Sequence, residues 1–251
     1  MQPWVKIRTS GQNHRFHDKF IRNWIESLPH YDGNTFLDIS AGNMPYRSIV
    51  ADAGFRYLSQ DFGQYSGDTR APGLQAALGN WPTSGHSITC NITDLPHETA
   101  DFFLCTEVLE HVPDPVAALK AIANSAKGGA VGLITVPFSS RMHQAPFWFS
   151  SGLSPYRFIY HAPTCGLEIT GITKVGDFVD VMIQEIGELF DKIRLNGFIR
   201  PILNIFSPPL SVICTKSLLE SGALGVYVSL KKLDTSTNSK PMVVHTRSAV
   251  M

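Results

Sequence analysis

Short apolar segments recur along the first half of the chain, and stretches with a helical pattern separate most of them. These segments cover residues 35–39, 55–60, 87–92, 101–106 and 130–136. Runs of this length are typical of strands buried inside a parallel sheet. Strands that alternate with helices predict an α/β fold built on a doubly wound, mostly parallel sheet.

The clearest helix is predicted between the last two of these segments, over residues 114–129. Asp114 is a residue type that caps helices, and Pro115 stands at the first helical position, where proline is favoured. Gly128 and Gly129 are expected to end the helix.

The flanking segments complete the predicted organisation. Phe16, Phe20, Trp24 and Leu28 recur every four residues, which predicts an amphipathic helix before the first strand. Two further strands are predicted late in the chain. The predicted parts are an N-terminal helical segment (1–33), the main core (34–176), a helical insertion or cap (177–222), the last core strand (223–232) and a disordered tail (233–251).

Composition points to small molecules as partners and not to nucleic acid. Basic and acidic residues both number 21, so the net charge is zero, and no basic block is present to neutralise phosphates. The four cysteines are scattered, which predicts reduced thiols. Without a signal-like segment or an eighteen-residue apolar run, the sequence predicts a cytoplasmic protein with no transmembrane segment.

The apolar stretch 197–213 lies within the predicted insertion and is interrupted by three prolines. A membrane-spanning helix is therefore not expected there. A cover over a pocket, a dimer interface and peripheral contact with a membrane surface all remain compatible with it.

The loop after the first strand has the order of a nucleotide-binding turn but lacks its usual glycines. Asp38 ends the first strand and Asp61, twenty-three positions later, ends the second, a spacing at which an acid reaches a bound ribose. Gly42 is the glycine that remains, and Pro45 removes an amide donor from the helix start. The loop therefore disfavours a pyrophosphate, and with it a nicotinamide dinucleotide. It suits S-adenosylmethionine, an adenosine with an amino-acid tail.

The stretch from "LCTEVLEHVPDPVAALKAI" through "KGGAVGLITVPF" resembles class I S-adenosylmethionine-dependent methyltransferases, and the likeness spans about residues 34–180. The resemblance implies a Rossmann-like sheet of seven strands whose last strand is antiparallel. Two further stretches, "QDFGQY" (60–65) and "HQAPFWF" (143–149), are similar to members associated with surface-polysaccharide or sugar modification.

The resemblance also implies roles for nine cofactor residues. Asp38, Ser40 and Gly42 would line the methionine moiety, and Asp61 would bind both ribose hydroxyls. Phe62 would pack on adenine, with Asn91 and Ile92 at the adenine edge. Thr106 and Glu107 would face the methionine end and the methyl group. Asn91 replaces the usual Asp, although its carbonyl oxygen can still accept a hydrogen bond.

His143 is the candidate general base, because it follows the fifth strand at the sheet edge where open α/β folds bind ligands. If the segment around them is helical, Glu107, Glu110 and His111 share one face. That spacing is compatible with a divalent ion, but a metal is not favoured and no metal ligand is assigned.

The acceptor is expected to bind to an aromatic segment that follows the fifth strand. Aromatic planes can stack on sugar or ring faces, and a cation adds a polar contact. The residues assigned to the acceptor are Phe147, Trp148, Tyr156, Arg157 and Tyr160. We expect O-methylation of a small or carbohydrate-like acceptor, which leaves S-adenosylhomocysteine. The alternatives are N- or C-methylation of a small molecule, or a catalytically silent protein that binds the nucleoside as a scaffold.

Overall fold

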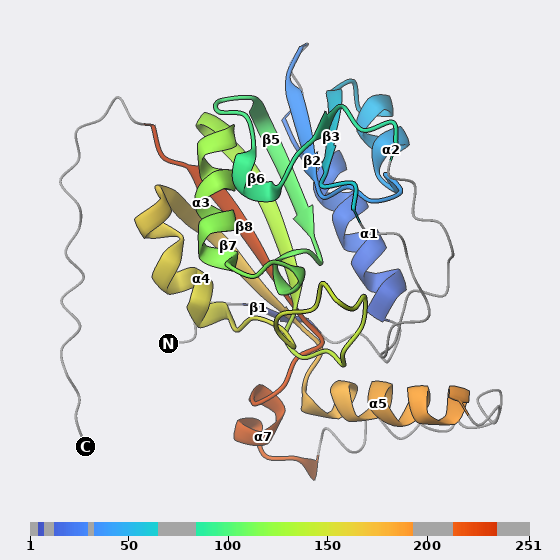
Figure 1. Cartoon of the computed structure of the whole chain (residues 1–251). Coiled ribbons are helices and arrows are strands. Elements are labelled where there is room, and N and C mark those ends of the chain that lie inside the picture. The colour runs from blue at the N-terminus through green and yellow to red at the C-terminus, as the bar shows by residue number, and fades with distance from the viewer. Residues whose placement is uncertain (1–4, 8–12, 30–32, 65–83, 193–212, 235–251) are drawn as a thin grey trace.

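The computed structural model describes residues 5–7, 13–29, 33–64, 84–192 and 213–234. Within this part, one sheet holds eight strands in the order β1-β7-β8-β6-β5-β2-β3-β4 (Figure 1). The strands are β1 (Val5–Ile7), β2 (Thr35–Ile39), β3 (Arg56–Asp61), β4 (Ile88–Thr89), β5 (Ala100–Thr106), β6 (Ala126–Pro137), β7 (Leu167–Val175) and β8 (Gly225–Lys232).

The sheet confirms the predicted doubly wound architecture. β8 runs antiparallel to both of its neighbours, β6 and β7, and the other pairs are parallel. The seven expected strands are present, and the short β1 adds an unexpected eighth beside β7.

Helices cover both faces of the sheet (Figure 1). They are α1 (Asn13–Glu26), α2 (Arg47–Asp52), α3 (Pro115–Ser125), α4 (Pro155–His161), α5 (Phe178–Lys192) and α7 (Lys216–Glu220), with short 3₁₀ turns η1 (Ile92–Asp94), η2 (Leu109–His111) and η3 (Pro163–Cys165). No helix in the described ranges is both long and apolar enough to cross a membrane. Residues 193–212, which hold most of the apolar stretch, and 235–251, which hold most of the predicted tail, lie outside the described residues.

Successive strand residues pack alternately into two hydrophobic cores, one on each face of the sheet. On β2, Phe36 packs under α1 and α2, whereas Leu37 points to the face covered by α3 and α4. This period of two is expected for a strand buried on both faces. Ile21 and Ile25 of α1 are fully buried in the first core, so the amphipathic N-terminal helix is held against the sheet.

Helix α3 begins as predicted but ends earlier. The Asp114 carboxylate accepts hydrogen bonds from the amides of Val116 and Ala117 at 3.0 and 2.9 Å. The helix stops at Ser125, and Ala126 already pairs with Ala100 in the sheet. The expected terminators Gly128 and Gly129 therefore lie within β6, because strand pairing extends further back than the helical pattern suggests.

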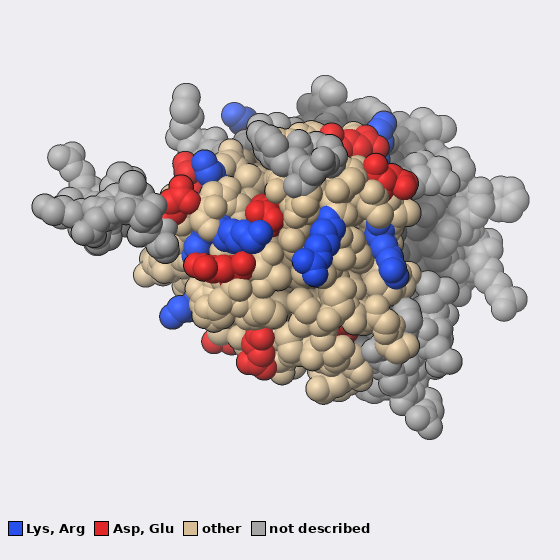
Figure 2. Space-filling model, turned by 90° about the horizontal axis from the view of Figure 1, so that it is seen from above, with Lys and Arg blue, Asp and Glu red and all other residues tan. Residues whose placement is uncertain are grey.

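The parallel strands point toward the lower edge of Figure 1, where their carboxyl ends meet the loop after β6 and helix α5. The opposite, amino-terminal edge is seen in Figure 2, where basic and acidic side chains are interspersed. Near the starts of β5 and β6, Asp101 Oδ2 and Lys127 Nζ form an ion pair at 2.8 Å.

Candidate active site

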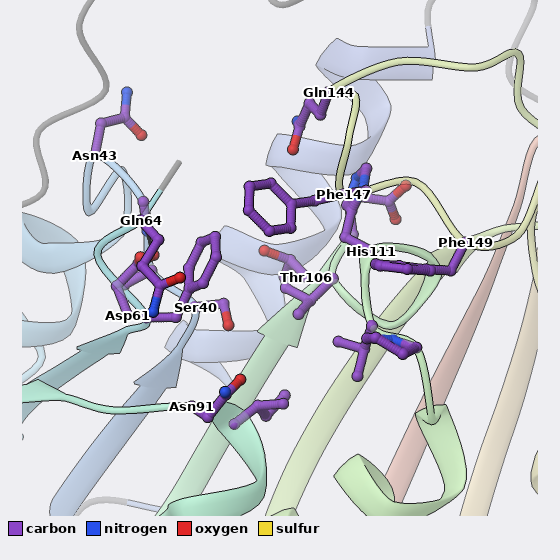
Figure 3. Close-up of a pocket in the computed structure, with 18 of the residues that line it drawn as sticks. Ser40, Asn43, Asp61, Gln64, Asn91, Thr106, His111, Gln144, Phe147 and Phe149 are labelled. Atoms are coloured by element: carbon purple, nitrogen blue, oxygen red, sulfur yellow. Dashed lines mark hydrogen bonds between the residues drawn. The ribbon is translucent and has the colours of Figure 1, made fainter. Parts of the chain in front are cut away.

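A cavity of about 620 Å³ opens at the carboxyl ends of β2, β3 and β5. In Figure 3, Ser40, Asp61 and Gln64 lie on one side of it and His111, Phe147 and Phe149 on the other, with Thr106 between them. Nine of the residues predicted to bind cofactor or acceptor line it: Ser40, Gly42, Asp61, Phe62, Asn91, Ile92, Thr106, Glu107 and Phe147. This is the edge where open α/β sheets bind ligands.

Asp61 is fixed at the end of β3 by two backbone amides. Its Oδ2 accepts from Gly42 N at 3.1 Å, and its Oδ1 accepts from Gly63 N at 2.9 Å. A carboxylate has about four acceptor sites, so each oxygen keeps capacity for a further donor. The side chain is thus positioned to accept from a pair of neighbouring hydroxyls in the cavity.

Asp38 lies behind the cavity wall and does not line it. The Tyr57 hydroxyl donates to its Oδ2 at 2.7 Å, and the side chain is almost fully buried. Burial raises the pKa of Asp38 to about 7; the Tyr57 hydrogen bond opposes this rise and the nearby charge of Asp61 adds to it. Asp38, predicted to line the methionine moiety, thus lies at the end of β2 outside the cavity lining and accepts a hydrogen bond from Tyr57.

Strained backbone surrounds the cavity. Ser40, Glu107 and Gln144 all line it and have φ values of 53°, the left-handed region that side chains with a Cβ rarely adopt. Conformations of this kind cluster at functional sites, where the surrounding structure holds them in place. The amide of Glu107 donates to Thr135 O at 2.9 Å, which fixes the turn after β5.

Gln60, a residue that the sequence analysis did not single out, joins two of the loops around the cavity. Its Oε1 accepts from the amide of Ser40 at 3.0 Å, and its Nε2 donates to Cys90 O at 2.7 Å. Because Gln60 is fully buried, both bonds are shielded from water. The loop after β2 is thereby tied to the segment that carries Asn91.

The predicted adenine side combines apolar and polar groups. Ile92 is buried, whereas Asn91 beside it is exposed. The rings of Phe62 and Phe147 meet edge to face with centroids 5.1 Å apart. Phe147 comes from the loop after β6, so aromatic side chains from both sides of the cavity meet.

His143, the predicted base, does not line the cavity, but its ring contacts that of the lining residue His111. We call Glu110, His111 and His143 the histidine cluster. The two imidazole rings meet edge to face at 4.7 Å. His111 Nδ1 lies 2.6 Å from Phe147 O, and His143 Nδ1 lies 2.8 Å from Arg141 O. A carbonyl can only accept, so both Nδ1 atoms carry protons, and in the neutral form of either ring the lone pair is on Nε2.

Burial sets the charge of this cluster. It lowers the pKa of His111 to about 4, which keeps that imidazole neutral near pH 7. Burial also raises the pKa of Glu110 well above its usual range, with the charge of Glu107 adding to the effect. The Glu110 carbonyl accepts from the amides of Phe149 and Ser150, so η2 also anchors the loop after β6.

The predicted grouping of Glu107, Glu110 and His111 is not the one that the structure forms. Residues 109–111 form a 3₁₀ turn instead of an α-helix, and Glu107 faces the cavity. The histidine cluster instead brings one ligand atom from each member within 4.8 Å of the others, a spacing and donor set that could hold a divalent ion.

Three of the predicted acceptor residues are not brought to the cavity. Tyr156 and Tyr160 of α4 are 63% and 74% exposed, and Arg157 is also exposed, because Phe158 takes the buried position on this short helix. Trp148 is adjacent to the cavity but does not line it. The lining also includes residues to which the sequence analysis assigned no cofactor or acceptor role: His17, Asn43, Gln64, His111, Gln144 and Phe149.

Comparisons with known proteins show the family and the fold of the chain. A family model described as a methyltransferase domain matches residues 13–163. No curated protein sequence shows significant similarity to the chain.

Several solved structures share the fold. The [4+2]-cyclase SpnF is 13% identical with a TM-score of 0.53, and the match covers 86% of this chain and 81% of that one. A SAM-dependent methyltransferase from Archaeoglobus fulgidus is 14% identical with a TM-score of 0.50, covering 88% and 100%. A Haemonchus contortus phosphoethanolamine N-methyltransferase, in complex with phosphomonomethylethanolamine and S-adenosylhomocysteine, is 13% identical with a TM-score of 0.50, covering 86% of this chain and 53% of that one.

Proposed function

Because the chain belongs to the methyltransferase domain family, we propose that it transfers the methyl group of S-adenosylmethionine to an oxygen atom of a small or carbohydrate-like acceptor. The observation that carries this proposal is the carboxylate of Asp61, fixed by two amides at one side of a 620 Å³ cavity whose other side is aromatic.

Each part of the cofactor would have a candidate partner in the cavity lining. Asp61 would accept from the two ribose hydroxyls, and Phe62 and Ile92 would contact the faces of adenine. The Asn91 amide would take the exocyclic amine through its oxygen. Thr106 and Glu107 would lie toward the methionine end, next to the strained loop of Ser40.

The opposite wall is proposed to receive the acceptor. Phe147 and Phe149 offer aromatic faces, Gln144 offers an amide, and His111 offers an imidazole. Flat aromatic surfaces with a few polar groups suit a sugar or a small ring. This wall supports an association with sugar or surface-polysaccharide modification.

Methyl transfer itself is an in-line displacement. An electron pair of the acceptor oxygen would form the bond to the methyl carbon, while the pair of the breaking carbon–sulfur bond would remain on sulfur and neutralise the sulfonium; the hydroxyl proton would pass to a base. We propose that His143 removes the acceptor's proton through Nε2, since its Nδ1 lies 2.8 Å from Arg141 O. His143 does not itself line the cavity, so the acceptor hydroxyl would have to approach it beside His111, whose ring contacts that of His143.

N- or C-methylation of a small molecule is the second candidate. It is supported by the similar fold of the Haemonchus enzyme, which is named as an N-methyltransferase. A binding protein without transfer activity is the third. SpnF, named as a cyclase, shows that this fold also serves other chemistry.

A labelled-methyl assay separates these candidates. The protein is incubated with methyl-labelled S-adenosylmethionine and a panel of sugars, catechols and small amines, and products are identified by mass spectrometry. A label on oxygen, lost in His143→Ala, supports the proposal. A label on nitrogen or carbon would contradict O-methylation and support the second candidate.

A further inference from the structure

The last two residues of β3 hold the loop that follows β2. Three consecutive amides of this loop donate to them. The amides of Ser40 and Ala41 donate to the side-chain and main-chain oxygens of Gln60 at 3.0 and 2.9 Å. The amide of Gly42 donates to the Asp61 carboxylate at 3.1 Å. Two of the three acceptors are side-chain atoms, so the identity of residues 60 and 61, and not strand pairing alone, decides where the loop lies.

Ser40 is the residue of this loop whose conformation most needs support. Its φ of 53° lies in the left-handed region, which glycine adopts freely but which strains a residue with a Cβ. Gly42 has a φ of 52° in the same turn and carries no such strain. A strained conformation persists only where the surrounding structure holds it. Ser40 is held through its amide by Gln60 Oε1.

The side chain of Gln60 is itself fixed in one orientation. It is fully buried, and its Nε2 donates to Cys90 O at 2.7 Å. The Ser40 amide can only donate and the Cys90 carbonyl can only accept, so the two partners leave the Gln60 amide one orientation. Strand β4 beside it has two residues, and the Cys90 amide that follows donates to Asp61 O at 3.2 Å. Gln60 therefore also supports the segment that carries Asn91.

The residues on either side of Gln60 meet the cavity, although Gln60 does not line it. Ser40, Gly42 and Asn91 all belong to the lining. We propose that Gln60 is a positioning residue for the cofactor, which holds Ser40 in its left-handed conformation and keeps the loop after β2 and the Asn91 segment where they meet the ligand. A glycine at position 40 would adopt this conformation without that contact. This inference rests on the proposed function, because it concerns affinity for the same cofactor.

Calorimetric titration of the full chain with S-adenosylhomocysteine in two backgrounds tests this role. Gln60→Met keeps the length and volume of the side chain but loses both hydrogen bonds. Alone, it should weaken binding about tenfold, because Ser40 can then relax out of its strained conformation. In the Ser40→Gly background, the same substitution should weaken binding less than about threefold relative to Ser40→Gly alone, because glycine keeps the turn without support.

Ser59→Ala is the matched control. Ser59 precedes Gln60 on β3, is buried, and accepts from the Ser87 amide through its hydroxyl at 3.2 Å, outside the cavity lining. Loss of this hydroxyl removes a buried hydrogen bond from the same strand, so urea denaturation should show a lower free energy of unfolding. Affinity for S-adenosylhomocysteine should nevertheless stay within about twofold, because the Ser40 contact is kept.

Two further measurements keep the inference testable if Gln60→Met does not fold. Gln60→Asn keeps a polar amide but is one methylene shorter, and it should show the same dependence on the Ser40→Gly background. Hydrogen exchange needs no variant. In the unmodified protein the Ser40 amide should exchange about as slowly as the Ala41 amide, and fast exchange of Ser40 alone would contradict its bond to Gln60.

The outcomes distinguish this inference from the proposed function. An equal loss of affinity in both backgrounds, no loss in either, or the same loss in Ser59→Ala would overturn the positioning role of Gln60 while leaving the cofactor assignment intact. Failure of the unmodified protein to bind S-adenosylhomocysteine would instead overturn the cofactor assignment and this inference with it.

Discussion

Replacement of Asp61 by alanine tests the proposed ribose contact. The carboxylate already accepts from Gly42 N and Gly63 N, and we assign its remaining capacity to the two ribose hydroxyls. A hydrogen bond to a charged group contributes about 1.5–3 kcal/mol, so two of them contribute at least about 3 kcal/mol. Since each 1.4 kcal/mol is a factor of ten, Asp61→Ala should weaken S-adenosylhomocysteine on the order of a hundredfold.

The substitution also leaves two amides without their acceptor, so part of any loss comes from a loosened loop. Calorimetric titration with S-adenosylhomocysteine and its 2′-deoxy analogue separates the two effects. The unmodified protein should discriminate strongly between these ligands, and Asp61→Ala should bind both with similar weak affinity. Unchanged discrimination in Asp61→Ala would refute the ribose assignment, whatever the absolute loss.

Further predictions concern catalysis, metal, pH and packing. His143→Ala should lower turnover about a hundredfold or more, because general-base catalysis typically contributes this much, while S-adenosylhomocysteine affinity stays within about twofold; normal turnover would exclude His143 as the base. Exhaustive chelation should leave methyl transfer unchanged, and loss of activity that one divalent ion restores would instead assign the histidine cluster as metal ligands. The pKa of Asp38 is about 7 in the folded protein, against the ordinary aspartate value of 3.8 that applies in the unfolded chain. The folded state therefore holds this proton more tightly, and stability should fall as pH rises from about 4 to 7. At about 1.4 kcal/mol per pKa unit, the free energy of unfolding should fall by a few kcal/mol over this range. In urea denaturation, Asp38→Asn should show a smaller pH dependence than the unmodified protein; identical pH profiles would contradict this. A Cβ at Gly132 would lie 2.0 Å from the Phe103 ring, so Gly132→Ala should destabilise the fold by about 1–3 kcal/mol in the same assay, and unchanged stability would contradict the described packing.

Local patterns were sufficient to predict most of the fold. Strands buried on both faces leave short continuous apolar runs in the sequence, and amphipathic helices leave apolar residues about every four positions; these patterns predicted the sheet and α1. The strand β1 was missed because it has three residues and pairs with residues 173–175, far along the chain. Its position is decided by the edge of the finished sheet, which no local pattern records.

The site was predictable only where residues follow strand ends. Parallel strands bring their carboxyl ends together, so Asp61 and Thr106 could be placed near one cavity from their order in the chain. His17 could not, since its partner Tyr227 lies 210 positions away. Tyr156 and Tyr160 were assigned from aromatic content, which does not reveal that the inward face of α4 belongs to Phe158.

The most direct test of the central claim is a crystal structure of the protein with S-adenosylhomocysteine. The account predicts the ligand in the cavity at the carboxyl edge of the sheet, both ribose hydroxyls within hydrogen-bond distance of Asp61, and the methionine end of the ligand toward Thr106 and Glu107. A ligand bound elsewhere, or bound in the cavity with its ribose away from Asp61, would contradict it.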